Sequence, residues 1–337
     1  MIGILLINLG TPLSAKTSDV RKYLKEFLSD PYVIDINPVA RWFLVNFIIA
    51  PFRSPRSAEA YQSIWKEEGS PLLFYTQELG KALQSEMGEE FHVEIAMRYG
   101  EPNIKSALLK LKEKNVEEIR AIPLYPQYAA SSTGSTLAKL HQLESQIKDL
   151  PTLKILRSFF DHEGFINSFS EIGKNYLANF QPDHILFSFH GLPVRHILKQ
   201  DIGGNHCFKT TDCCEKIIPA NGLCYRAHCF QSAREIGKKL KIPQSDYSIC
   251  FQSRLGRTPW IEPFTDILIE DLAKQNKKRL LVFCPSFVAD CLETLEEIGI
   301  RARSSFIESG GEDLMLVPSL NAHPTWVKAL SNMLQGK

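Results

Sequence analysis

Short runs of apolar residues alternate with longer amphipathic stretches along the chain, and this alternation constrains the fold more than any other feature. Runs such as ILLIN near the N-terminus and LLVFC at residues 280–284 are almost entirely apolar, which is typical of strands covered on both faces. The stretches between them repeat apolar residues with the period of a helix. Because strands and helices that alternate form parallel sheets, we predict an α/β fold of the doubly wound, Rossmann-like kind.

The expected elements form two series, one before about residue 160 and one after it. The expected strands are 3–8, 92–97, 118–123, 154–158, 184–189, 247–251, 279–284 and 313–318. The expected helices are 18–28, 58–66, 76–86, 103–114, 135–148, 163–178, 227–240, 265–276, 289–298 and 325–334. At roughly 150 residues per domain, 337 residues also suggest two domains. We predict domains at 1–160 and 161–322, followed by a C-terminal helix within 323–337.

The charge and the termini exclude several classes of protein. Lys and Arg number 39 and Asp and Glu 38, so the net charge of +1 gives no basic field for nucleic acid. The N-terminus has neither a basic region nor a cleavage site, and no segment has about 18 consecutive apolar residues. We therefore expect a cytoplasmic protein without a spanning helix. The uncharged run at 42–52, WFLVNFIIAPF, predicts either a core helix or an apolar lip at a pocket or membrane surface.

Residues that follow the expected strands are the first candidates for a site, because ligands in this fold class bind beyond the carboxyl ends of strands. Arg98 and Tyr99 follow the strand 92–97, and Tyr125 with a hydroxyl-rich turn follows 118–123. That turn could bind an anion or only cap a helix. His190 follows the strand 184–189 and precedes a Gly-Leu-Pro turn. It could be a structural histidine or a base that works near neutral pH.

Three acidic residues recur within the expected helix 289–298. Asp290, Glu293 and Glu297 have the spacing i, i+3 and i+7, which places them on one helical face. Such a row is usually a solvated surface. If it faces a pocket that also holds His190, it could instead accept protons and guide a divalent cation. No GxGxxG or GxxxxGK[ST] motif occurs, so a nucleotide cofactor has no support.

Seven motifs share their order with one family of enzymes. They are NLGTP, GSPL, RYG, PLYPQYAASSTGS, FSFHGLP, FQSRLGRTPWIEP and FVADCLETLEE, and the match around them extends from residue 4 to about residue 323. Together they resemble the ferrochelatases, which insert Fe²⁺ into a porphyrin at the end of haem synthesis. The resemblance implies the class II chelatase fold, with a porphyrin held between two Rossmann-like domains. It also implies protoporphyrin IX and Fe²⁺ as substrates and protohaem as product.

The resemblance assigns roles to individual residues. His190 matches the acceptor of pyrrole protons, and Glu293 matches the catalytic glutamate, with Asp290 and Glu297 continuing the path of the metal. The residues implied to bind porphyrin are Leu9, Arg53, Ser70, Arg98, Tyr99, Tyr125, Trp260 and Phe287. Two positions depart from the common pattern: Cys291 replaces a histidine of many members, and Arg301 lies where some members extend the acidic row. Both departures concern the outer metal path rather than the reaction.

Five of the eight cysteines lie within 23 residues: Cys207, Cys213, Cys214, Cys224 and Cys229. They lie in a segment at about 200–229 that is only a brief loop in shorter ferrochelatases. Four thiolates can bind a [2Fe–2S] cluster or a structural zinc ion. The resemblance favours the cluster, because some bacterial ferrochelatases hold one. Zinc, unliganded buried thiols and a disulfide are the alternatives, and one cysteine, of the adjacent pair or Cys229, would be spare.

Two other functions compete with protoporphyrin ferrochelatase. One is a chelatase acting on coproporphyrin III, and the other is a non-catalytic haem or iron sensor on the same fold. The apolar run at 42–52 favours the more hydrophobic protoporphyrin IX, and Arg41 and Arg53 near its ends suit peripheral contact with an anionic membrane. A sensor would not need both His190 and Glu293. We expect no nucleic-acid partner.

Overall fold

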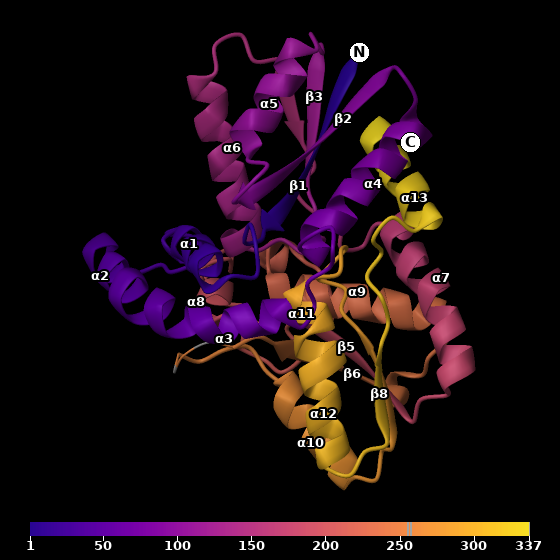
Figure 1. The fold of residues 1–337 in the computed structure, drawn as a ribbon. Helices are drawn as coiled ribbons and strands as arrows, with labels where there is room; N and C mark the ends of the chain where they lie inside the picture. The colour runs from indigo at the N-terminus through magenta and orange to yellow at the C-terminus, as the bar shows by residue number, and fades with distance from the viewer. Residues whose placement is uncertain (255, 257, 337) are drawn as a thin grey trace. The chain divides into compact units, whose positions relative to one another are not determined.

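The computed structural model describes residues 1–254, 256 and 258–336 and divides the chain into two compact units. The first unit contains residues 1–125, 130–158 and 327–337, and the second contains 126–129 and 159–326. Each unit holds a four-stranded sheet flanked by helices, as Figure 1 shows. All strand pairs are parallel, which confirms the predicted α/β class. The last eleven residues join the first unit rather than forming a separate part.

The sheet of the first unit has the order β2 (Phe91–Tyr99), β1 (Ile2–Gly10), β3 (Glu118–Pro123) and β4 (Thr152–Ile155). Because β2 and β3 lie on opposite sides of β1, the order reverses at β1. The carboxyl ends of β1 and β3 therefore form a switch point at which ligands bind in this class of fold. The helices connected with this sheet are α1 (Thr17–Leu28), α4 (Pro71–Met87), α5 (Ile104–Glu113), α6 (Ser135–Gln146), preceded by the π-helical turn η2 (Ala130–Gly134), and α13 (Pro324–Gln335).

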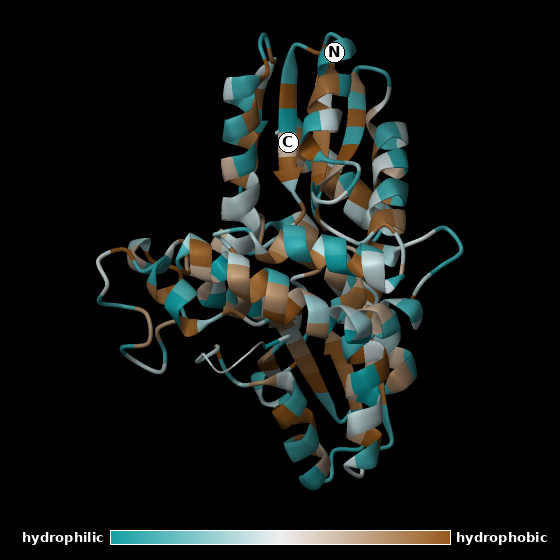
Figure 2. Ribbon diagram, turned by 60° about the vertical axis from the view of Figure 1, so that its left-hand side comes forward, coloured by the Kyte–Doolittle hydropathy of each residue, from teal (hydrophilic) through white to brown (hydrophobic). Residues whose placement is uncertain are grey.

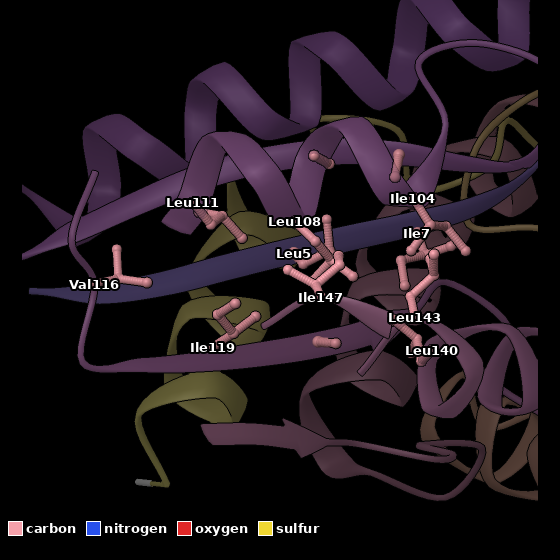
Figure 3. Packing of buried hydrophobic residues seen from close by; sticks show 13 residues of the cluster. Leu5, Ile7, Ile104, Leu108, Leu111, Val116, Ile119, Leu140, Leu143 and Ile147 are labelled. Carbon is pink, nitrogen blue, oxygen red and sulfur yellow. The ribbon is translucent and has the colours of Figure 1, made fainter. Parts of the chain in front are cut away.

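The core of the first unit forms around β1, whose residues from Ile4 to Ile7 are fully buried. Leu5 and Ile7 pack against apolar residues of α5 and α6, including Leu108 and Leu143, as Figure 3 shows. Burying an aliphatic side chain of this size stabilises a fold by roughly 1.5–3 kcal/mol. This burial explains why β1 is an unbroken apolar run rather than an alternating one.

The uncharged run at 42–52 lies in a continuous helical segment of α2 (Pro38–Phe43), the π-helix η1 (Leu44–Ile49) and α3 (Ala50–Gln62). Five of its large apolar side chains are more than half exposed: Trp42, Phe43, Phe47, Ile48 and Phe52. The alternative of a core helix is therefore wrong, because only Val45 and Ala50 of this run are buried. Among the described residues, no helix has the length and apolar character needed to cross a membrane.

The sheet of the second unit has the order β6 (Tyr247–Gln252), β5 (His184–His190), β7 (Arg279–Phe283) and β8 (Asp313–Leu316). It has the same connectivity as the first sheet, so its order reverses at β5. Figure 2 shows hydrophobic positions along the strands of both sheets, with hydrophilic positions between them in several strands of the first unit. The helices of this unit are α7 (Glu163–Phe180), α8 (Val194–Leu198), α9 (Tyr225–Lys239), α10 (Thr265–Lys274), α11 (Leu292–Leu295), α12 (Arg303–Glu308), the 3₁₀ turns η3 (Pro219–Asn221) and η4 (Gln244–Asp246), and the π-helix η5 (Glu297–Ala302).

The expected helix 289–298 is the largest error of the sequence-based assignment. The helix begins at Leu292, after an extended residue, Cys291, and it passes into η5. Asp290 prevents an earlier start, because its carboxylate accepts hydrogen bonds from Thr294 Oγ1 at 3.0 Å and from Ser319 N at 3.1 Å. Smaller errors are the expected strand 154–158, which is 152–155, and the expected helix 58–66, which is the end of α3. The helices α2, α8 and α12 were not predicted.

Candidate active site and cysteine pocket

His190 is the last residue of β5, where its main chain and its ring are both fixed. The main-chain N–H donates to Ser286 Oγ at 3.4 Å, and the carbonyl accepts from Tyr225 Oη at 2.8 Å. Nδ1 of the ring lies 2.6 Å from the carbonyl oxygen of Gly191. Because a carbonyl can only accept, Nδ1 carries the proton of the neutral ring, and the lone pair remains on Nε2. His190 can therefore accept a proton at Nε2.

The turn after His190 brings the backbone of Gly191 close to the backbone of Gln252, which requires glycine at this position. Its N–H donates to the carbonyl oxygen of Gln252 at 2.7 Å. A Cβ at this position would lie 2.8 Å from the same oxygen and 3.3 Å from the ring of Trp260. Only glycine fits there, so the Gly of the His-Gly-Leu-Pro turn has a steric cause.

Gln252 and Ser253, at the end of β6, hold the acidic residues of the site. Gln252 Nε2 donates to the main-chain oxygen of Glu293 at 2.6 Å. Ser253 donates to the carboxylate of Glu297 through its N–H, at 2.9 Å, and through its hydroxyl. Neither residue was predicted from the sequence as a site residue. The available signal was their position directly after an expected strand, the same criterion that selected His190.

The carboxylates near His190 influence one another. Burial raises the pKa of Glu297, and the neighbouring charge of Glu293 raises it further, whereas Ser253, Arg301 and His190 act in the opposite direction. Burial also raises the pKa of the Cys291 thiol, which lies beside the carboxylate of Glu293. The structure thus brings His190, Glu293 and Glu297 into electrostatic contact, with groups that can accept and pass on protons.

Asp290 does not present its oxygens in the way the expected helical row implied. Its side chain is 3 % exposed and accepts from Asn321 Nδ2 at 2.8 Å in addition to Thr294 and Ser319. Its carboxylate therefore has three donors within the protein and stabilises the start of α11. The predicted arrangement of Asp290, Glu293 and Glu297 on one α-helical face is wrong, because Asp290 precedes the helix and Glu297 begins the π-helix η5.

Phe287 and Trp260 are half-buried in the second unit. The ring of Phe287 lies 6.3 Å from that of His190 at an angle of 62°. Trp260 pairs with Pro193 through an isolated β-bridge, so it lies beside the turn that follows His190. Two apolar rings therefore flank this turn.

In the first unit, three polar side chains form a compact hydrogen-bond network around Asp30. Its Oδ2 accepts from Arg98 Nη2 at 2.6 Å, from Ser135 Oγ at 2.7 Å and from Tyr99 Oη at 2.9 Å. Tyr99 is 1 % exposed, and burial raises the pKa of its hydroxyl. Asp30 and Ser135 were not predicted, because their partners lie 36 to 105 residues away in sequence. Arg98 is thus held in place by a buried carboxylate.

The other predicted residues of the first unit lie near strand ends, directly before α4 and on α3. Leu9, at the end of β1, is half-buried and precedes Gly10, which has a φ of 122° and whose Cβ would lie 1.9 Å from the carbonyl oxygen of Tyr99. Ser70 is buried and accepts from Thr11 Oγ1 at 2.6 Å. Tyr125 is buried, whereas Arg53 on α3 is exposed.

The five clustered cysteines are all buried free thiols of the second unit. Cys224 is a hydrogen-bond neighbour of both Cys207 and Cys214, and Cys214 Sγ lies 3.8 Å from Cys213 Sγ. We call these four residues the cysteine pocket. Cys229 is a neighbour of the Tyr225 hydroxyl instead, although it lies within electrostatic range of Cys214.

Polar side chains order the loop that carries the pocket. Asp201 Oδ2 accepts from the main-chain N–H groups of His206 and Cys207, each at 2.9 Å. Asn221 is fully buried and donates to the carbonyl oxygens of Cys213, at 3.0 Å, and Lys216, at 2.9 Å. The loop is therefore folded by hydrogen bonds between side chain and backbone, of a kind that needs no metal.

The donor groups of the cysteine pocket suit a metal ion, whereas their spatial arrangement is not that of a formed metal site. Four buried thiols are a suitable donor set for iron or zinc, and about 3.8 Å separates two sulfurs on a tetrahedral metal with bonds of about 2.3 Å, as between Cys213 and Cys214. Burial raises the pKa values of the Cys207 and Cys213 thiols. Within residues 1–254, 256 and 258–336, no three His, Cys, Asp or Glu side chains are arranged to hold a metal ion. The donor set fits, but the arrangement is not that of a formed metal site.

Comparison with solved structures supports the fold. The chain resembles SirB from Bacillus subtilis with Fe³⁺, with a TM-score of 0.54 and 11 % identity, over 99 % of this chain and 94 % of that one. It resembles the sirohydrochlorin chelatase SirB from Bacillus subtilis subspecies spizizenii in complex with cobalt at a TM-score of 0.55 and 9 % identity, with the same coverage. At these identities the likeness shows the class II chelatase fold alone.

Comparison of sequences supports the family. A model of the ferrochelatase family matches residues 1–337. Ferrochelatase from Coxiella burnetii (strain CbuK_Q154) is 47 % identical over 332 residues, which cover 98 % of this chain and 92 % of that protein. Ferrochelatase from Legionella pneumophila (strain Lens) is 45 % identical over 333 residues, with 98 % of each chain covered. The chain belongs to the ferrochelatase family and is an enzyme of haem biosynthesis that inserts iron into a porphyrin.

Proposed function

We propose that this enzyme inserts Fe²⁺ into protoporphyrin IX and that His190 removes the pyrrole protons. The observation that carries this proposal is the contact of His190 Nδ1 with the carbonyl oxygen of Gly191, because it leaves Nε2 as the basic nitrogen. The reaction joins one Fe²⁺ to the ring and releases two pyrrole protons. His190 accepts them one at a time at Nε2 and passes each to a neighbouring carboxylate.

Glu293 and Glu297 are the proposed acceptors of those protons and the final part of the path of the iron substrate. Glu297 lies in electrostatic contact with both His190 and Glu293. Gln252 holds the backbone of Glu293, and Ser253 holds the carboxylate of Glu297. Burial favours the protonated form of Glu297, which suits a group that receives a proton. Asp290 does not bind the iron in this proposal but stabilises the start of α11, because its oxygens are already bonded within the protein.

Each unit by itself contains residues proposed to contact the porphyrin. Leu9, Trp260 and Phe287 supply apolar and aromatic surface, and the exposed guanidinium of Arg53 suits a propionate. Insertion is accelerated if these contacts favour a puckered ring over a flat one, because only differential binding lowers the barrier. We assign Tyr99 a supporting role, since it is buried and bonded to Asp30. Arg98, Ser70 and Tyr125 remain proposed binding residues.

The substitution His190→Ala tests the proposal. Insertion of Fe²⁺ or Zn²⁺ into protoporphyrin IX should fall at least about a hundredfold, the usual contribution of a general base, while porphyrin binding followed by fluorescence is retained. His141→Ala, an exposed histidine of α6, is the matched control. Normal turnover by His190→Ala would refute the role of His190.

The same assay distinguishes the alternative functions. Faster insertion into coproporphyrin III than into protoporphyrin IX would assign the other tetrapyrrole as substrate. Binding of both porphyrins without insertion into either would favour a sensor. The exposed apolar run at 42–52 supports protoporphyrin IX, which has fewer carboxylates to satisfy.

We also propose that the cysteine pocket holds a [2Fe–2S] cluster, with Cys207, Cys213, Cys214 and Cys224 as ligands and Cys229 as the spare thiol. The mutual contacts of the four sulfurs support this choice of ligands. The purified protein should be coloured and should contain two iron and two sulfide per chain, and Cys207→Ser should lose both. Bound zinc without sulfide, or colourless protein without iron, would contradict the cluster. Retention of the cluster in Cys213→Ser but not in Cys229→Ser would contradict the ligand set.

Finally, we propose a cytoplasmic enzyme whose exposed run at 42–52 touches a membrane surface. The exposed rings of Trp42 and Phe47, with Arg41 and Arg53 near the ends of the run, match the amphipathic character of such surfaces. Phe47→Ser should weaken sedimentation with vesicles that contain an anionic lipid. Leu13→Ser, which changes an exposed leucine outside the run, should not. Equal binding of both variants would contradict the proposal.

A further inference from the structure

The main chain of His190 is enclosed in a small ring of hydrogen bonds. Tyr225 Oη lies 2.8 Å from the carbonyl oxygen of His190 and 3.0 Å from Ser286 Oγ, which accepts the N–H of His190 at 3.4 Å. The single proton of Tyr225 goes to the carbonyl, so the hydroxyl of Ser286 must donate to the tyrosine oxygen. Both main-chain polar groups of His190 are thus held by two side chains.

Tyr225 is also attached to the cysteine pocket. It is the first residue of α9, directly after Cys224, and it is 5 % exposed. One turn along the same helix, the Cys229 thiol is a hydrogen-bond neighbour of its hydroxyl, and Cys229 lies in electrostatic range of Cys214. A shift of the first turn of α9 therefore moves the hydroxyl that holds His190.

We propose that Tyr225 is a positioning residue for His190 and that it couples the cysteine pocket to iron insertion. This inference rests on the proposed role of His190 as the proton acceptor. Its physical basis is that the ring of His190 is fixed by the adjacent Gly191 carbonyl, so a rotation of the peptide at residue 190 redirects Nε2. Small displacements of a catalytic group lower a rate strongly because proton transfer requires hydrogen-bond geometry.

The coupling gives the segment at about 200–229 a function. A change in the pocket, such as loss of a bound group, alters the packing around Cys224 and reaches His190 through one tyrosine. No redox step at the porphyrin is involved, because the iron enters and remains as Fe²⁺. The pocket acts only through the position of the histidine.

Tyr225→Phe tests the positioning role, since it removes one hydroxyl and retains the buried ring. We expect kcat for Zn²⁺ insertion into protoporphyrin IX to fall about tenfold, with unchanged KM values for both substrates. The acidic limb of the pH profile of kcat, which reports the proton acceptor, should also shift. Tyr247→Phe is the matched control, because this half-buried tyrosine packs on Phe187 away from His190. If Tyr225→Phe is unstable, Ser286→Ala tests the same ring. Unchanged kcat in a folded variant of this ring overturns the proposal.

A double-mutant comparison tests the coupling. Cys207 lies outside α9 and its thiol neighbours Cys224, which directly precedes this helix. Cys207→Ser should lower kcat in the wild-type background but have no further effect in Tyr225→Phe. Independent, multiplying effects would overturn the coupling. The proposed function fails separately: if His190→Ala still turns over, the role of His190 is wrong. If His190→Ala is inactive while Tyr225→Phe has normal kcat, only the present inference is refuted.

Discussion

Acidification should destabilise this protein through His228, a residue of α9 that is 1 % exposed. Its Nδ1 accepts the N–H of Tyr128 at 3.2 Å, and its Nε2 donates to the carbonyl oxygen of Gly222 at 3.0 Å. Its ring stacks on Phe160 with the ring centroids 3.7 Å apart. A second proton would turn Nδ1 from an acceptor into a donor, which would then face the N–H group of Tyr128. Burial accordingly lowers the pKa of His228 to about 4.

The sign and size of the effect follow from the two pKa values. The unfolded chain, with a histidine pKa of about 6.5, binds a proton at a pH where folded His228 does not, so stability falls as the pH decreases below about 6.5. Between pH 7 and pH 5 the loss is about 2 kcal/mol, and below pH 4 it levels off at about 3 kcal/mol.

Urea unfolding at pH 7 and pH 5 measures this loss in the wild type and in His228→Gln. Glutamine can accept from Tyr128 and donate to Gly222 but does not titrate. The variant should therefore lose about 2 kcal/mol less than the wild type over this pH range. His141→Gln, an exposed histidine, should behave as the wild type. Equal pH dependence of His228→Gln and wild type, or an NMR titration that gives His228 an ordinary pKa, would refute the reasoning.

Two further predictions concern the carboxylates of the site. Asp30→Asn should destabilise the protein by about 3–5 kcal/mol in urea unfolding, because the largely buried guanidinium of Arg98 loses its counter-charge. The control Asp266→Asn, in the exposed pair with Arg254, should cost less than about 1 kcal/mol. Equal costs would contradict the importance of the buried pair. The folded-state pKa of Glu297 is raised, so its protonation stabilises the folded protein in acid, and this stability is lost as the pH rises through that pKa. Glu297→Gln, which does not titrate, should therefore gain stability relative to the wild type as the pH rises. A stability difference that does not depend on pH would exclude this titration.

The strands and several residues of the candidate site could be predicted from local sequence. Continuous apolar runs such as that of β1 and β5 identify strands buried on both faces, and they fix where each strand ends. His190 and Arg98 were then selected as candidates because strand ends carry sites in parallel sheets. These inferences need only the order of residues along the chain.

The remainder depended on contacts between distant residues. Tyr225 lies 35 residues from His190, and Asp30 lies 68 residues from Arg98. The i, i+3, i+7 spacing placed Asp290 on the helix, and this was wrong. The Asp290 carboxylate is bonded to Ser319 and Asn321, so the helix begins only after it. The count of cysteines was visible in the sequence, but which of them meet was not.

The shared connectivity of the two sheets means that the strand-end rule applies to both units in the same way. Each sheet places its first strand between the second and the third, so β1 and β5 are the strands at which the order reverses. Leu9 and Gly10 end β1, and His190 ends β5. A polar side chain at the end of such a strand is surrounded by the ends of its neighbours, as His190 is by Gln252 of β6 and by Ser286 beyond β7. The groups that hold a catalytic residue at a switch point should therefore be sought first at the ends of the two flanking strands, where Gln252, Ser253 and Ser286 all lie.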